Sequence, residues 1–179
     1  MKLFIASDIH GSAYYAELAV KKFEESGAER LLLLGDILYH GPRNDLPRDY
    51  APKKVIALLN PLADKILAVR GNCEAEVDQM VLDFNVSSDY LTLSDGEVTI
   101  CASHGHRPVP ALSEGDVHLY GHTHVPVIEK TDAGYYNVNP GSTSIPKENS
   151  PHSYIIYENG VFNWYDLETG ECYKTGKVR

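Results

Sequence analysis

The sequence predicts an α/β fold in which a parallel sheet carries helices on its faces and the second half of the chain is mostly β. Three times in the first half, a short apolar run is followed by a loop and then by a segment with helical spacing, as in proteins with βαβ units. In the second half, strand-like runs lie closer together and turn dipeptides separate them. The length of 179 residues suits one domain, residues 1–179, with a single well-buried core.

The first half of the chain alternates strands and helices. After the first apolar run, Tyr15, Leu18 and Phe23 recur at helical spacing, and the second run consists of four leucines. We expect strands at residues 2–7, 31–34 and 66–69, and helices at residues 13–25, 53–59 and 74–84. A long loop, residues 36–52, follows the second strand, and loops of this length in compact domains are often functional.

The second half consists of strands joined by tight turns. The dipeptides Asp-Gly at 95–96, Asn-Gly at 159–160 and Thr-Gly at 169–170 have the composition of hairpin turns. We expect strands at residues 90–93, 98–103, 117–120, 125–129, 135–138, 154–157 and 161–166.

The composition excludes several classes of protein. No window approaches the roughly 18 apolar residues of a membrane span, and the first apolar run, residues 3–6, is shorter than a signal-peptide core of about 7–15 residues. Cys73, Cys101 and Cys172 have no CxxC spacing, so neither a disulfide framework nor a thiolate zinc site is expected. The net charge of −9 disfavours strong nucleic-acid binding, which needs an excess of Lys and Arg. We therefore expect a cytoplasmic protein without membrane contacts.

The apolar strands end in polar residues next to glycine. These endings are the stretches DIHG (residues 8–11), GD (35–36), GN (71–72), HGH (104–106) and GHTH (121–124). In open α/β sheets, the carboxyl ends of the strands form the crevice in which ligands bind, and glycine lets the backbone turn sharply there. The topology is therefore expected to deliver these side chains to one rim.

The side chains at this rim form a set of metal donors. Two aspartates, an asparagine and four or five histidines offer oxygen and imidazole donors without sulfur, which suits Mn²⁺, Fe or Zn²⁺. Any one of these histidines alone would more often be structural, but the joint pattern favours ligands. Seven donors are too many for one ion, so we expect a pair of ions about 3.5–4 Å apart. Such ions would let an acidic protein hold a phosphate anion locally.

The order of the motifs DIHG, GD, GNC, HGH and GHTH resembles that of the calcineurin-like metallophosphoesterase superfamily over residues 8–124. Within this superfamily, the small size, the HGPRN stretch (40–44) and the NPGS stretch (139–142) are similar to the bacterial YfcE-type phosphodiesterases, up to about residue 157. The resemblance implies an α/β fold of one kind: a four-layer α/β/β/α sandwich with two packed mixed sheets flanked by helices.

The resemblance also implies a ligand set and a reaction. By analogy with the family, the first ion is held by Asp8, His10 and His124, the bridging ligand is Asp36, and the second ion is held by Asn72, His104 and His122. The cofactors would be two divalent ions, foremost Mn²⁺, with Zn²⁺, Fe and Ni²⁺ as alternatives. A hydroxide between the ions would attack phosphorus, and because metals lower the pKa of bound water to near 7, no separate general base is required.

One position departs from the superfamily pattern. Many members have a histidine after the asparagine, where it is thought to protonate the leaving group or touch the phosphate, whereas this chain has Cys73. A thiol with an ordinary pKa of about 8.5 is a poor proton donor to an alkoxide, so good leaving groups should react best. His106, or His40 from the long loop, could replace the missing imidazole, and Cys73 is expected to pack beside the site rather than act as a nucleophile. The predicted catalytic residues are Asn72, Cys73, His104 and His106.

The predicted substrate contacts are His40, Arg43 and Asn44. The guanidinium of Arg43 offers a planar fork to phosphate oxygens, although Arg43 and Asn44 could equally fix the loop. Asn139 and Ser142 surround a plain turn composition, and the resemblance alone raises them as site residues. His118 lies within an apolar strand and is expected to be structural.

Two functions of different classes fit these observations. The first is a metal-dependent phosphodiesterase that hydrolyses small phosphodiesters by attack of a dimetal-bound hydroxide on phosphorus. The second is a catalytically weak or inactive scaffold of the same fold, as in a retromer subunit, that works through protein contacts. The complete ligand set favours the enzyme. Its partner would be a small phosphoester substrate, and the sequence is compatible with a homo-oligomer.

Overall fold

In the computed structural model, which describes residues 1–96 and 98–178, the chain alternates strands and helices before it becomes wholly β. The first-half elements are β1 (Lys2–Ala6), α1 (Ala13–Ser26), β2 (Arg30–Leu33), α2 (Pro52–Leu59), the short 3-10 helix η1 (Asn60–Leu62), β3 (Ile66–Ala68) and α3 (Glu76–Val81). The second-half elements are β4 (Tyr90–Asp95), β5 (Val98–Ser103), β6 (Val117–Leu119), β7 (Pro126–Lys130), β8 (Tyr136–Pro140), β9 (Ser153–Glu158), β10 (Val161–Asp166) and β11 (Cys172–Lys177).

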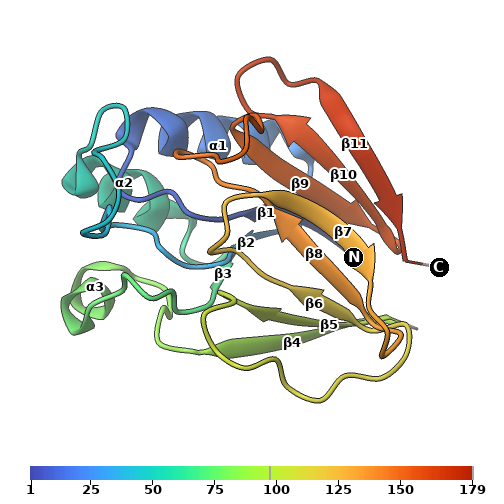
Figure 1. Ribbon diagram of the computed structural model, residues 1–179. Helices are drawn as coiled ribbons and strands as arrows, with labels where there is room; N and C mark the ends of the chain where they lie inside the picture. The colour runs from blue at the N-terminus through green and yellow to red at the C-terminus, as the bar shows by residue number, and fades with distance from the viewer. Residues whose placement is uncertain (97, 179) are drawn as a thin grey trace.

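Two mixed sheets pack face to face and helices flank them (Figure 1). The six-stranded sheet has the order β11-β10-β9-β1-β2-β3, and the five-stranded sheet has the order β4-β5-β6-β8-β7. Strands β1, β2 and β3 are mutually parallel, and so are β5, β6 and β8. The remaining pairs are antiparallel. The predicted α/β fold is confirmed, including its two mixed sheets.

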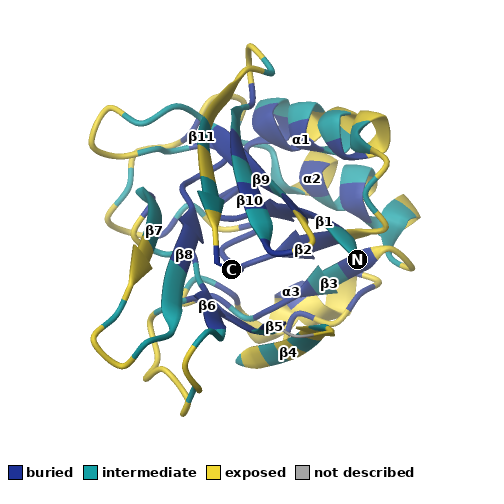
Figure 2. Ribbon diagram, turned by 90° about the vertical axis from the view of Figure 1, so that its right-hand side faces the viewer, coloured by how far each residue is buried: buried dark blue, intermediate teal, exposed yellow. Residues whose placement is uncertain are grey.

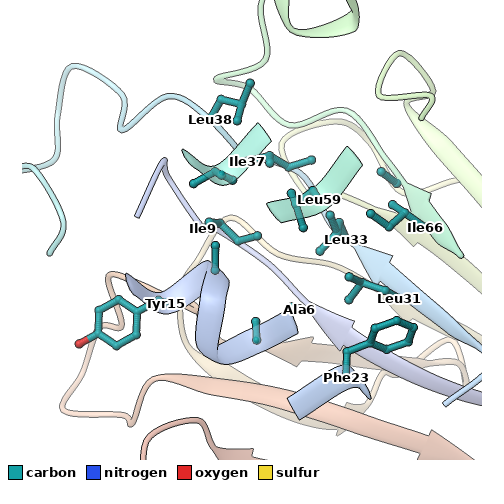
Figure 3. Close-up of a cluster of buried hydrophobic side chains, with 14 of the residues drawn as sticks. Ala6, Ile9, Tyr15, Phe23, Leu31, Leu33, Ile37, Leu38, Leu59 and Ile66 are labelled. Atoms are coloured by element: carbon teal, nitrogen blue, oxygen red, sulfur yellow. The ribbon is translucent and has the colours of Figure 1, made fainter. Parts of the chain in front are cut away.

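Strand β1 is apolar on both faces because each face is covered by another layer. Side chains alternate along a strand, so Phe4 and Ala6 join the cluster under helices α1 and α2, whereas Leu3 and Ile5 join the cluster between the sheets. Figure 3 shows part of the helix-side cluster. The central strands are accordingly buried while the outer surface of α1 is exposed (Figure 2). The apolar interior is thus divided by the six-stranded sheet into two clusters, rather than forming the single core expected.

Helix α1 starts and ends at residues suited to capping. The hydroxyl of Ser12 accepts a hydrogen bond from the Tyr15 N–H at 3.3 Å, and Gly27 follows the last turn with a φ of 67°. These are common solutions for the unpaired backbone groups at helix ends. Helix α1 is therefore capped at both ends, and its N-cap Ser12 directly follows the DIHG stretch.

Two elements differ from the sequence prediction. The helix expected at residues 74–84 is shorter, because Glu74 precedes it in a loop and Leu82 is already extended with a ψ of 129°. Strand β11 was not predicted, because its side chains are mostly exposed and show no apolar alternation. The Thr-Gly turn that precedes β11 was recognised, and the strand pairs with β10.

The parallel strands of both sheets end at the same rim. Backbone hydrogen bonds join the segments that leave these strands: the Thr143 N–H donates to the carbonyl of Ser7 at 2.9 Å, and the Gly121 N–H donates to that of His104 at 3.1 Å. Within residues 1–96 and 98–178, none of the helices has the length and apolar character that a membrane crossing needs.

Candidate metal centre

The side chains predicted as metal ligands come together at this rim from five separate strand ends. The Nε2 atom of His124 lies 3.2 Å from Asp8 Oδ1, and the Nε2 atom of His10 lies 3.5 Å from the same oxygen. The Nε2 atom of His104 lies 3.4 Å from Asp36 Oδ1 and 3.1 Å from Asn72 Oδ1. His122 completes the group, with its ring centroid 5.1 Å from that of His104.

Asp8 has one carboxylate oxygen in use and one without a partner. Its Oδ2 accepts hydrogen bonds from the Ser7 hydroxyl at 2.6 Å and from the His122 N–H at 3.0 Å. Its Oδ1 is buried and makes no hydrogen bond with any described residue, although imidazole nitrogens surround it. A buried anionic oxygen without a partner is costly. A cation at this position would satisfy it, so the donor set fits a metal.

Asp36 faces both sides of the donor group. Its Oδ2 lies 3.7 Å from His10 Nε2, while its Oδ1 lies 3.4 Å from His104 Nε2 and accepts a hydrogen bond from the Cys73 N–H at 2.9 Å. Three triads have ligand atoms that all lie within 4.8 Å of one another: Asp8, His10 and His124; Asp8, Asp36 and His104; and His10, Asp36 and Cys73.

Three histidines are oriented by backbone carbonyls. The Nδ1 atom of His10 lies 2.8 Å from the carbonyl oxygen of Tyr39, that of His104 lies 2.6 Å from Leu34, and that of His124 lies 2.7 Å from Ile145. Donation from Nδ1 fixes the tautomer that leaves a lone pair on Nε2, which is the usual arrangement for imidazoles that bind metals. All three Nε2 atoms point into the donor group.

The backbone at the rim adopts a conformation that L-residues seldom take. Positive φ angles between 48° and 68° occur at Asp8, His10, Asp36, His122 and His124. Each such residue costs of order 1–3 kcal/mol, and such residues persist only where the surrounding structure holds them. The strand ends are therefore held in a conformation that local preferences oppose.

Without cations, protons balance part of the negative charge in the site. Burial lowers the pKa of His104, but its hydrogen bond to Asp36 and the charges of Asp8 and Asp36 outweigh this and raise the pKa to about 9. Burial raises the pKa of Asp36, but the same contact with His104 holds it below its ordinary value. Divalent ions would compete with these protons for the same donor atoms.

Asn139 and the serines that follow it hold the rim in place. The Asn139 amide donates to the carbonyl of Gly121 at 2.7 Å, and the hydroxyls of Ser142 and Ser144 both donate to the carbonyl of Asp8, at 2.9 and 3.1 Å. Asn139, Ser142 and Ser144 are buried. They bond to loop backbones rather than facing the cavity. Because β8 is parallel to β6, its carboxyl end also lies at the rim, and this topology would have identified them.

A cavity of about 440 Å³ opens over the donor group. Its lining includes His10, Asp36, Asn72, His122 and His124 from the rim. The predicted contacts Arg43 and Asn44 also line it, together with Cys73, Thr123 and Lys147. Lys147 was missed in the sequence because it stands in a polar loop without a motif. Within the described part of the chain, neither Arg43 nor Lys147 forms an ion pair.

His40 and His106 do not reach this cavity as the sequence prediction required. The ring of His40 packs against Tyr39 and Tyr50, with centroid distances of 4.7 and 5.1 Å. Its carbonyl accepts a hydrogen bond from the Asn44 amide at 2.7 Å, so Asn44 also fixes the loop. His106 is exposed, with its ring centroid 5.4 Å from that of His104. Among the described residues, neither His40 nor His106 lines the cavity.

Cys73 and His118 lie where the sequence predicted. Cys73 lines the cavity beside Asn72, whose amide lies 3.2 Å from the thiol sulfur. Burial, followed by the charge of Asp36, raises the pKa of the thiol far above its ordinary value. His118 is buried with its Nε2 2.9 Å from the Ser103 hydroxyl, as expected for a structural residue.

Comparisons with known proteins identify similar sequences and structures. A profile of the calcineurin-like phosphoesterase superfamily domain matches residues 1–160. The phosphodiesterase YfcE of Escherichia coli strain K12 is 47% identical over 167 residues, which cover 91% of this chain and 90% of that protein. A solved structure of YfcE, described as a phosphoesterase from Escherichia coli, superposes with a TM-score of 0.95 at 44% identity, with full coverage of both chains.

A more distant structure shares the fold alone. The Vps29 protein of Entamoeba histolytica, solved in complex with Zn²⁺, superposes with a TM-score of 0.66 at 17% identity and full coverage of both chains. At this identity the likeness concerns chain topology.

Proposed function

Because this chain belongs to the calcineurin-like phosphoesterase superfamily, we propose that it is a metal-dependent phosphodiesterase that hydrolyses small phosphodiesters. The observation that carries the proposal is the convergence of seven oxygen and imidazole donors at one rim, five of which line an open cavity, together with the unpartnered Asp8 Oδ1 among three of the imidazoles. The relative that is 47% identical over nine tenths of the chain bears the name of a phosphodiesterase, which supports this choice of reaction.

The donors divide into two groups that share Asp36. In the first group, Asp8, His10 and His124 would hold one divalent ion. In the second, Asn72, His104 and His122 would hold the other. Asp36 would serve both ions, a role supported by its two oxygens, which face His10 and His104 respectively. Oxygen and imidazole donors without a bound thiolate suit Mn²⁺ foremost, and also Fe, Zn²⁺ or Ni²⁺.

The chemistry that two bound divalent ions supply is a water of lowered pKa as nucleophile and charge neutralisation at the phosphoryl oxygens. Other residues of this chain would bind the substrate and hold the ligand loops in place. Arg43 and Lys147 lack acidic partners in the described structure and line the cavity, so both can pair with phosphoryl oxygens. Asn139, Ser142 and Ser144 fix the loops that carry Asp8 and His122.

Among the described residues that line the cavity, every histidine belongs to the predicted ligand set. Cys73 occupies the position beside Asn72, burial raises its pKa, and neither His40 nor His106 lines the cavity. Leaving groups of low pKa need no proton, so aryl phosphodiesters should react faster than alkyl ones.

Hydrolysis of bis(4-nitrophenyl) phosphate, with and without added Mn²⁺, tests this function. We expect turnover that requires the metal and is lost in Asp36→Asn, with the fold of the variant checked by circular dichroism. A folded, Mn²⁺-loaded sample with no turnover would overturn the proposal and favour the alternative scaffold role. Metal content of the purified protein, measured by mass spectrometry, would identify the native ion.

A further inference from the structure

We propose that Glu74 is a positioning residue that sets the ends of β2 and β3 relative to each other and thereby places Asp36 and Asn72 for metal binding. This inference rests on the proposed function, because it concerns the same site. Glu74 does not line the cavity and is not one of the predicted ligands. Its side chain bonds to the backbone of the loops that carry the donors.

The carboxylate of Glu74 accepts hydrogen bonds from three backbone N–H groups of two separate loops. Its Oε1 accepts from Ile37 at 2.7 Å, and its Oε2 accepts from Asp36 at 2.9 Å and from Gly71. Glu74 is only 8% exposed. Hydrogen bonds to an ionised acceptor are about twice as strong as neutral ones. One side chain therefore joins the loop after β2 to the loop after β3.

The two loops lie in close contact beside Glu74. A Cβ atom on Gly35 would lie 2.6 Å from the backbone nitrogen of Gly71. A Cβ on Gly71 would collide with the side chains of Asp36 and Glu74. Three N–H groups thus converge on one buried point. A carboxylate, with two oxygens and about four acceptor sites, can satisfy all three.

The position of Asp36 depends on this bridge. Its backbone has a φ of 54°, which local preferences oppose, and its N–H is held by Glu74. Asn72 follows Gly71, whose N–H is held by the same oxygen. Loss of the bridge should therefore release both predicted ligands. Residues that orient metal ligands from the outer layer commonly contribute about 10–100-fold to metal affinity.

The decisive comparison is Glu74→Gln against a matched control, Asp78→Asn. Glutamine has the same shape, but its NH₂ group faces N–H groups instead of accepting from them. Asp78 is equally buried at 7% and accepts from the Ala75 N–H at the start of α3 at 3.0 Å, with no bond to either metal loop. The variants would be titrated with Mn²⁺ by calorimetry at pH 8.

We expect the Kd for Mn²⁺ to rise by about 10–100-fold in Glu74→Gln and to stay within about threefold in Asp78→Asn. In the metal-free protein, NMR hydrogen exchange should accelerate at the Asp36, Ile37 and Gly71 amides. Exchange within α1 should stay unchanged. A change confined to these amides separates positioning from general destabilisation.

The opposite results would overturn the inference. A folded Glu74→Gln protein with wild-type Mn²⁺ affinity and wild-type exchange at the three amides contradicts it. If Glu74→Gln does not fold, Glu74→Asp takes its place. Its carboxylate is one methylene shorter and should retain part of the wild-type affinity for Mn²⁺. Wild-type Mn²⁺ affinity in a variant whose three amides have lost their protection would contradict the bridge. Wild-type protein that binds no Mn²⁺ at all would instead contradict the proposed function.

Discussion

Asp36 is the residue whose role can be tested most simply by substitution. Because its two oxygens face His10 and His104, its loss should disturb both halves of the donor group, whereas loss of His10 disturbs one. We therefore expect Asp36→Asn to lower kcat for an aryl phosphodiester at least about tenfold more than His10→Ala, a difference of about 1.4 kcal/mol. Steady-state kinetics at saturating Mn²⁺ would measure this, and losses in the reverse order would contradict the bridging role.

We propose that Cys73 limits the range of leaving groups. An imidazole at this cavity position could supply the proton that a thiol of raised pKa withholds. Cys73→His should increase turnover of alkyl phosphodiesters and phosphomonoesters by at least about tenfold, within the range typical of general acid catalysis. Bis(4-nitrophenyl) phosphate should change less. Equal effects on both substrate classes would mean that another group already donates the proton.

Lys147 should contribute to substrate binding rather than to the chemical step. Its side chain is exposed and lines the cavity, and its backbone N–H donates to the carbonyl of His124 at 3.2 Å. We expect Lys147→Met to raise KM about two- to fivefold with kcat nearly unchanged, the usual size of one exposed charge contact. Lys53→Met is the matched control, because Lys53 is exposed on α2 and does not line the cavity. Equal KM values in the two variants would remove Lys147 from the site.

The sequence identified a site residue only where a polar side chain directly follows an apolar strand. Asp8, His10 and the other donors stand directly after apolar runs, so their convergence follows from topology. Glu74 and Lys147 carry no such signal. The role of Glu74 depends on three N–H groups that meet only after β2 and β3 pair, and His40 faces Tyr50 because of a loop conformation that no local pattern specifies.

At the scale of elements, the site depends on close contact between the ends of β2 and β3. Gly35 has a φ of 89° and would place a Cβ 2.6 Å from Gly71, whereas Gly27 has a φ of 67° and nothing within 4 Å. Gly27→Ala should lower the free energy of unfolding by only about 1–2 kcal/mol, the cost of the left-handed conformation. Gly35→Ala should cost clearly more and abolish Mn²⁺ binding. Equal losses in urea denaturation would show that the loops can separate without penalty.

Element prediction succeeded for strands with an apolar run or apolar alternation and failed for β11, which has neither. Strands β1 and β2 are nearly continuous apolar runs because both faces are covered. Strand β11 is an exposed edge whose pairing to β10 decides its conformation, so its sequence lacks the alternation that would identify it. Helix α3 is short because Glu74 is committed to the metal loops and cannot extend it.

For the whole molecule, stability of the metal-free protein should depend on pH through His104. Its pKa is raised to about 9 in the folded state, above the ordinary 6.5. The stabilisation is therefore complete below about pH 6.5 and is lost as the pH rises to about 9. Thermal melts in EDTA should show Tm falling over this window. Saturating Mn²⁺ should raise Tm and flatten the dependence, because a bound ion replaces the proton. A constant Tm in EDTA between pH 6.5 and 9 would contradict this assignment.

The whole fold explains how an acidic chain can act on an anion. Two sheets bring residues from 8 to 147 together at one rim, and the lining gathers Arg43 and Lys147 although the net charge is −9. The sequence could predict the convergence of the metal donors from the order of its strand endings. It could not predict that Lys147 joins the lining, because the loop that carries Lys147 has no motif.

We propose that the seven donors hold two neighbouring divalent ions. Anomalous diffraction at the manganese absorption edge, from crystals grown with Mn²⁺, tests this proposal most directly. We expect two peaks about 3.5–4 Å apart, with Asp36 between them, Asp8, His10 and His124 around one, and Asn72, His104 and His122 around the other. A single peak, or peaks away from these residues, would contradict the account.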